Sequence, residues 1–120
     1  MRHLKEGIGW RLGYTPDASV FKGLVGGDRW AVELTEVEFA DFCRLALQLA
    51  DTVRSLATEL MDEERLTCEQ ETPHIWLEVE GLPNAFELRF MLLAGRQAEG
   101  GWDATATAAI IQAIPAVTLF

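Results

Sequence analysis

The sequence predicts an α+β fold of duplicated βββα units, in which a curved antiparallel sheet packs on one long central helix and a shorter C-terminal helix. Three observations support this prediction. Residues 34–61 repeat apolar side chains at helical spacing, the flanking segments alternate apolar and polar residues, and three strands followed by a helix occur twice. A chain of 120 residues suits one domain, with pseudo-repeats at about residues 7–64 and 65–117.

The long central helix has a clear start. Thr35 and Glu38 stand at the spacing of a capping box, and Leu34 and Phe39 at that of a hydrophobic staple. The apolar residues that follow at helical spacing are Phe39, Phe42, Cys43, Ala46, Leu49, Ala50, Val53, Leu56, Ala57 and Leu60, with Leu45 and Leu47 beside them. Because this stripe is broader than one sheet covers, we expect the C-terminal helix or a second subunit in a homodimer to bury the rest.

Three strands precede this helix, at residues 7–14, 20–25 and 30–34. The sequence Gly-Gly-Asp-Arg at residues 26–29 is a strong hairpin turn signal between the second and third strands. A four-residue turn at this point places Val25 opposite Trp30.

The second unit begins with a strand at residues 66–71, followed by a hairpin of strands 75–80 and 85–93 around a four-residue turn. This register places Trp76 opposite Arg89 as a cation–π pair. A loop then leads to a helix at residues 104–114, capped by Asp103 and ended or kinked by Pro115. The apolar residues Val117, Leu119 and Phe120 predict a docked C-terminus.

The charge of the chain is negative and unevenly distributed. The net charge is −9, and residues 35–80 alone, with three basic and twelve acidic residues, account for that value. A negative field disfavours approach to nucleic acid or to an anionic membrane, and it favours a basic protein partner.

Several features indicate a cytoplasmic location. The sequence has no apolar run long enough to cross a membrane, and its first residues lack the apolar region of a signal peptide. Cys43 and Cys68 lie on apolar faces of different predicted elements, without CxxC spacing, which favours two buried, reduced thiols over a disulfide or redox pair.

No catalytic constellation is present, so we predict that the protein is not an enzyme and uses no cofactor and no metal. The two histidines are His3, near the terminus, and His74, in a predicted turn, and no known catalytic or phosphate-binding motif occurs. Gly26-Gly27 and Gly100-Gly101 are interpreted as simple turns.

The acidic residues on the outward face of two adjacent strands form the candidate site for a protein partner. The predicted partner-binding residues are Glu69, Glu71, Trp76, Glu78 and Glu80, and the acids at the end of the helix (Glu59, Asp62, Glu63 and Glu64) extend the same negative region. Two other interpretations stay open: a solvated face that only blunts sheet edges and aids solubility, and a divalent metal site of converging carboxylates.

A second function class is a single-stranded nucleic-acid binder. Its stacking platform would consist of Trp10, Tyr14 and Trp30 beside Arg11, Lys22 and Arg29. The net negative charge makes this the less favoured hypothesis. Trp10 and Trp30 are also predicted as core residues, which is the alternative to a stacking platform. Trp102 is predicted as the anchor of the last helix.

Several segments resemble a small cyanobacterial family of uncharacterised proteins, a domain of unknown function numbered 1818. The segments are Gly9-Trp10-Arg11, residues 30–35 (WAVELT), 41–45 (DFCRL), 60–64 (LMDEE), 76–81 (WLEVEG), 88–90 (LRF), Gly95-Arg96, Glu99-Gly100 and Trp102. The resemblance implies a fold similar to the single-stranded-DNA-binding regulators of the Whirly and transcriptional-coactivator type, which are built from duplicated units. It carries over no catalytic or binding residue, and a shared fold does not determine function.

Overall fold

The structure, a computed structural model that describes residues 2–117, contains two units of four strands and one helix. The first unit consists of β1 (His3–Gly7), β2 (Trp10–Tyr14), β3 (Gly23–Gly26), β4 (Ala31–Leu34) and α1 (Glu36–Leu56). The second consists of β5 (Leu66–Glu71), β6 (Ile75–Leu82), β7 (Ala85–Leu92), β8 (Glu99–Trp102) and α2 (Ala104–Val117). Each set of four strands forms its own antiparallel sheet in sequence order.

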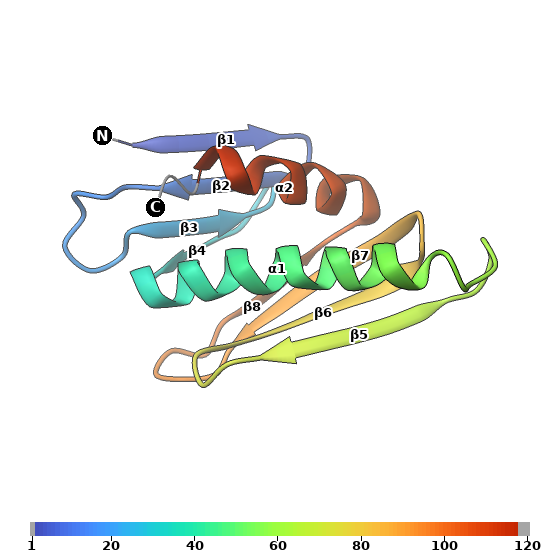
Figure 1. Cartoon of the computed structure of the whole chain (residues 1–120). Coiled ribbons are helices and arrows are strands. Elements are labelled where there is room, and N and C mark those ends of the chain that lie inside the picture. Colours follow the sequence, from blue (N-terminus) through green and yellow to red (C-terminus); the bar gives the residue numbers. More distant parts are fainter. Residues whose placement is uncertain (1, 118–120) are drawn as a thin grey trace.

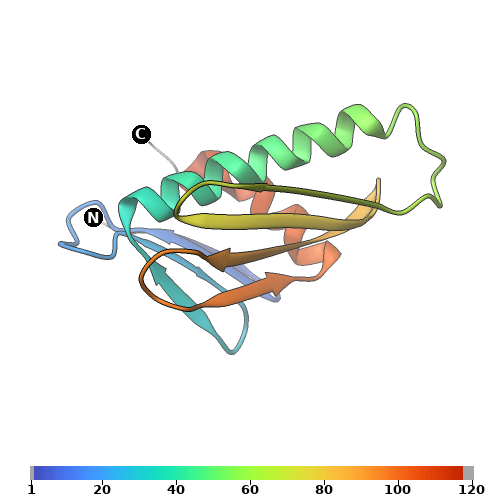
Figure 2. The same ribbon diagram turned by 90° about the horizontal axis from the view of Figure 1, so that it is seen from below.

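The two units interlock through their helices. Helix α1, which ends the first unit, packs chiefly on β5 and β6 of the second sheet, and α2 packs on β1 and β2 of the first sheet and on β7. Figure 1 shows the two helices side by side and antiparallel, and Figure 2 shows the second sheet extending along the length of α1. Each helix therefore completes the core of the other unit as well as its own.

The predicted α+β class and the duplication of the units are confirmed, but each unit has four strands where the sequence predicts three, and the strands form two sheets instead of the one predicted. The predicted strand 7–14 contains a turn, because Ile8 and Gly9 join β1 to β2 in a two-residue hairpin turn, and residues 3–7 form an additional strand. Gly9 has a φ of 83°, which only glycine adopts without strain. Residues 99–102, predicted as the end of a loop and the start of the last helix, form β8.

Both predicted hairpins are present, each with a register that differs by two residues, and the turn of the second is shorter than predicted. Val25 pairs with Val32, and Trp76 pairs with Met91, not with Arg89. Strands β6 and β7 continue to Leu82 and Ala85, so the turn between them has two central residues. A shift of two keeps every side chain on its predicted face, and Ile75, Leu77 and Val79 are buried as expected.

The start of α1 follows the prediction, and its end does not. Glu38 Oε1 accepts from the Thr35 N–H at 2.9 Å, and Thr35 Oγ1 accepts from the Glu38 N–H at 3.2 Å, which completes the capping box. The helix ends at Leu56, five residues before Met61. Acidic residues 62–64 oppose the negative end of a helix dipole, so continuing the helix to them is unfavourable.

Helix α2 is capped as predicted, since Asp103 Oδ1 accepts from the Ala106 N–H at 2.8 Å. Pro115 does not end the helix, which continues to Val117. Val117 is fully buried, in agreement with a docked C-terminal segment. The other residues of that prediction, Leu119 and Phe120, lie outside the described residues.

The units meet at a cluster of four aromatic rings. Trp30, between β3 and β4, contacts Phe90 and Trp102. Phe42 of α1 packs edge-on against the same two rings, with centroids 5.7–6.0 Å apart. The Trp102 indole N–H donates to the Gly26 carbonyl at 2.9 Å, which ties β8 to β3. Within residues 2–117, the structure has no helix that meets the length and apolarity a membrane crossing requires.

Candidate functional site

The outward side of the second sheet carries most of its polar side chains, and we call it the acidic face. It consists of Thr67, Glu69, Glu71, Trp76, Glu78, Glu80, Glu87, Arg89, Met91 and Glu99. The strand pairing places Glu69 beside Glu78 and Glu71 beside Trp76, so the five predicted partner-binding residues share one surface. Within residues 66–102, six glutamates and one arginine make up the charge of this face.

Trp76 is held in place on the acidic face by two neighbours. Its indole N–H donates to Glu69 Oε2 at 3.1 Å, and the Arg89 guanidinium lies 5.5 Å from the centroid of its ring. The predicted cation–π pair therefore forms diagonally across the sheet, although the residue directly opposite Trp76 is Met91. Trp76 and Met91 together form an apolar patch between Glu71 and Glu99, at one end of the face.

Arginines neutralise two of the glutamates. Arg89 donates to Glu78 Oε1 from Nη2 at 2.7 Å and from Nε at 3.2 Å, and Arg65 binds Glu80 Oε1 in the same way at 2.6 and 3.2 Å. The hydrogen bond and then the charge of Glu78 raise the pKa of Arg89, and Glu80 has the same effects on the pKa of Arg65. Both guanidiniums are solvent-exposed, so these pairs add little stability.

The remaining carboxylates keep their charge available. Among residues 2–117, the side chains of Glu71, Glu87 and Glu99 have no hydrogen-bond or ion-pair partner. Glu87 lies directly across the ladder from Glu80. Like charges on opposed strands repel each other, so a cation that binds at this face would be attracted by the carboxylates and would relieve their mutual repulsion.

Two shallow hollows lie on either side of the Arg89 side chain. One, of about 320 Å³, is lined by Glu78, Glu80, Glu87 and Arg89. The other, also about 320 Å³, contains Trp76, Met91 and Glu99 above the backbone of Gly100 and Gly101. The face thus offers one depression lined by charged side chains only and, next to it, one that also contains the apolar side chains of Trp76 and Met91.

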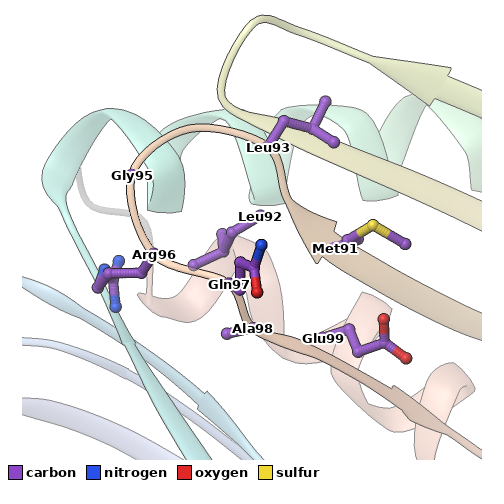
Figure 3. A pocket seen from close by; sticks show the side chains of 8 residues that line it. All are labelled: Met91, Leu92, Leu93, Gly95, Arg96, Gln97, Ala98 and Glu99. Atoms are coloured by element: carbon purple, nitrogen blue, oxygen red, sulfur yellow. The ribbon is translucent and has the colours of Figure 1, made fainter.

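A pocket of about 490 Å³ lies under the β7–β8 loop and adjoins the acidic face through Met91 and Glu99 (Figure 3). Arg96 in this loop donates to the Glu33 carbonyl at 2.6 Å and to Glu38 Oε1 at 2.5 Å, and its guanidinium lies over the ring of Phe21. Arg96 therefore fastens the loop to the first unit.

The aromatic platform predicted on the first unit does not form. Tyr14 is buried and stacks on Phe39 with centroids 5.6 Å apart, and Trp30 belongs to the aromatic cluster of the core. Burial, then the charge of Glu36, raise the pKa of Tyr14. Arg11 donates to the carbonyls of Gly27 and Trp30, while Lys22 donates to those of Pro16 and Ala18. These cations stabilise loops of the first sheet.

The cysteines and acidic residues show no assembled chemical centre within residues 2–117. Cys43 and Cys68 are free thiols, and burial raises the pKa of Cys43 to about 12, so its thiolate is scarce at neutral pH. In this part of the chain no three His, Cys, Asp or Glu side chains converge closely enough to hold a metal ion.

Two comparisons place the chain among known proteins. The sequence model of the family described as "Domain of unknown function (DUF1818)" matches residues 5–117. The chain belongs to this family. The expected resemblance to a cyanobacterial family of unknown function is thereby confirmed.

The fold of this DUF1818 chain is similar to that of a protein from Prochlorococcus sp. NATL2A, whose crystal structure is described as that of a protein with unknown function from the DUF155 family. The two share 29% sequence identity with a TM-score of 0.91, over 98% of each chain. The comparison with curated proteins gives no match. Similarity to the Whirly and transcriptional-coactivator fold stays a prediction.

Five residues of the acidic face of this DUF1818 chain were absent from the predicted site: Thr67, Glu87, Arg89, Met91 and Glu99. Glu87 and Met91 lie on the outward side of the predicted strand 85–93, and only the register error separated them from Glu80 and Trp76. Glu99 could not be placed because β8 was predicted as a loop.

Proposed function

We propose that the protein is a non-enzymatic interaction module that binds a basic protein partner on the acidic face. The observation that carries this proposal is the unneutralised charge beside a half-buried aromatic residue, Trp76, and an exposed methionine, Met91. Six glutamates share the face with one arginine, and Trp76 and Met91 lie in one row between Glu71 and Glu99. Interfaces favour this combination, in which an aromatic anchor supplies buried area and charges of one sign select and steer the partner.

The two hollows suggest how such a partner binds. A lysine or arginine side chain entering the hollow of Glu78, Glu80 and Glu87 gains from three carboxylates, two of which already bind arginines of this chain. An apolar side chain of the partner then covers Trp76 and Met91 in the neighbouring hollow. The partner we infer is a protein segment with a basic residue next to an apolar one.

Affinity capture from a native lysate tests this proposal. A variant with Glu69, Glu71, Glu78 and Glu80 replaced by lysine is expected to lose the basic proteins that the wild-type chain retains, because the field of the face is reversed. A matched control changes Glu59, Asp62, Glu63 and Glu64 to lysine, four exposed acids between α1 and β5, and alters the net charge equally.

The control is expected to keep the partners, since its substitutions lie off the sheet. Capture of the same proteins by the sheet variant would overturn the proposal. Loss by both variants would show that net charge, not the acidic face, is responsible, and would also count against it.

A further inference from the structure

Helix α2 has an outer side without charge. None of the residues from Ala104 to Val117 is charged, and those exposed on the helix are Thr105, Ala108, Gln112, Pro115 and Ala116. In a chain in which 24% of residues are charged, a 14-residue surface helix ordinarily carries several charges. Depletion of charged residues is the compositional signal of an interface core, and α2 shows this depletion over its whole length.

A groove runs beside this helix. It has a volume of about 410 Å³ and lies between α2, the second half of α1 and the β6–β7 turn, with Ala57, Phe86 and Ile111 among its lining residues. Figure 1 shows α1 and α2 side by side at this point. Of the ten residues that line the groove, only Arg54 is charged, and it is paired with Asp51 at 2.7 Å.

The charge of the chain indicates which partner this surface fits. Two copies, each with a net charge of −9, repel each other wherever their carboxylates meet. A two-fold axis beside α2 brings uncharged helix against uncharged helix and leaves the two acidic faces apart. A basic partner, in contrast, is drawn to the acidic face and gains nothing electrostatically from α2.

We propose that two copies of this chain pair through the uncharged side of α2 and the groove between α1 and α2. The pairing covers Ala57 of α1 and Ile111 of α2, which line the groove and stay partly exposed in the single chain. It is independent of the proposed partner on the acidic face, since the two surfaces share no residue. The pairing should also tighten as salt screens the repulsion between copies, whereas binding of a basic partner weakens with salt.

Light scattering after size exclusion, together with sedimentation equilibrium of the full chain, tests this proposal. The wild-type mass is expected to rise from 13.4 kDa towards twice that value as concentration and salt increase. Ala108→Glu places a carboxylate against its copy across the two-fold axis and is expected to weaken the dimer about tenfold or more. Gln112→Glu, one helical turn further on, should act in the same direction.

The matched control is Gln48→Glu, an exposed substitution of equal charge on the side of α1 opposite the groove residues Ala50, Val53 and Ala57. It is expected to leave the dimer intact. Circular dichroism establishes that each variant is folded. If one of the two α2 variants does not fold, the other is enough to test the dimer. A wild-type chain that stays at 13.4 kDa at every concentration and salt would overturn the proposal, as would folded α2 variants that associate like the wild type.

Discussion

The two sheets are built alike, but their outward faces differ. Both are four-stranded antiparallel sheets in sequence order, and both are followed by a helix. The outward side of the first sheet includes Leu4, Arg11, Leu24 and Glu33, with charges of both signs. The outward side of the second carries six glutamates and one arginine.

This difference separates what the fold requires from what it does not. The inner faces of both sheets are buried by the same kinds of apolar side chain, because each contributes to one core. Since the first sheet folds with mixed charges on its outer side, the fold itself does not require the negative charge on the second. The acidic face is therefore the better candidate for a function acquired by one of two similar sheets.

The largest expected effect concerns the inner faces, which the two units share. Phe42→Ala removes a fully buried ring that contacts Phe90 and Trp102, and it is expected to destabilise the protein by about 3–5 kcal/mol. Urea denaturation followed by circular dichroism measures this loss. The transition should stay a single step, because both units depend on this cluster; two separate transitions would show that the units fold independently.

A smaller effect is expected at the connection between the β7–β8 loop and the first unit. Arg96→Met leaves the buried Glu38 carboxylate without its guanidinium, at a cost of about 1–2 kcal/mol, also measured by urea denaturation. The control is Arg44→Met, which breaks a more exposed ion pair with Asp41 and should cost less than about 1 kcal/mol. Equal losses for both variants would contradict a fastening role for Arg96.

The smallest effect on stability is expected on the acidic face. Arg89→Gln breaks an ion pair whose arginine is largely exposed, so stability should fall by less than about 1 kcal/mol. Affinity for the basic partner should nevertheless rise, because Glu78 loses its intramolecular counter-charge. Titration calorimetry measures this gain, with Arg44→Gln as a control of equal charge change away from the face. Weaker binding by Arg89→Gln alone would instead assign Arg89 a direct contact with the partner.

The sequence predicts the helices and the faces of the strands well, because capping and periodicity are local signals. Thr35 and Glu38 mark the start of α1, and the alternation through Ile75, Leu77 and Val79 identifies the buried side of β6. The candidate partner-binding site is predicted from the same alternation, because it places Glu69, Trp76 and Glu78 on one face of the sheet.

The features that the sequence does not reveal depend on contacts between distant residues. Alternation continues from Ile8 to Trp10 and conceals the turn at Gly9. Gly100 is predicted as part of a loop, yet it lies in β8, where a Cβ atom would come within 2.5 Å of the Trp30 ring. That glycine accommodates a side chain from the other unit, which no local pattern reports.

The central claim is that the outward face of the second sheet, and not that of the first, binds the partner. Backbone amide shifts of the isotope-labelled chain, recorded while the captured basic protein is added, test it most directly. We predict that the largest shifts occur in β5, β6 and β7, around Glu69, Trp76 and Arg89, and that added salt reverses them. Shifts concentrated instead in β1–β4, or in the acidic segment between α1 and β5, would contradict the claim.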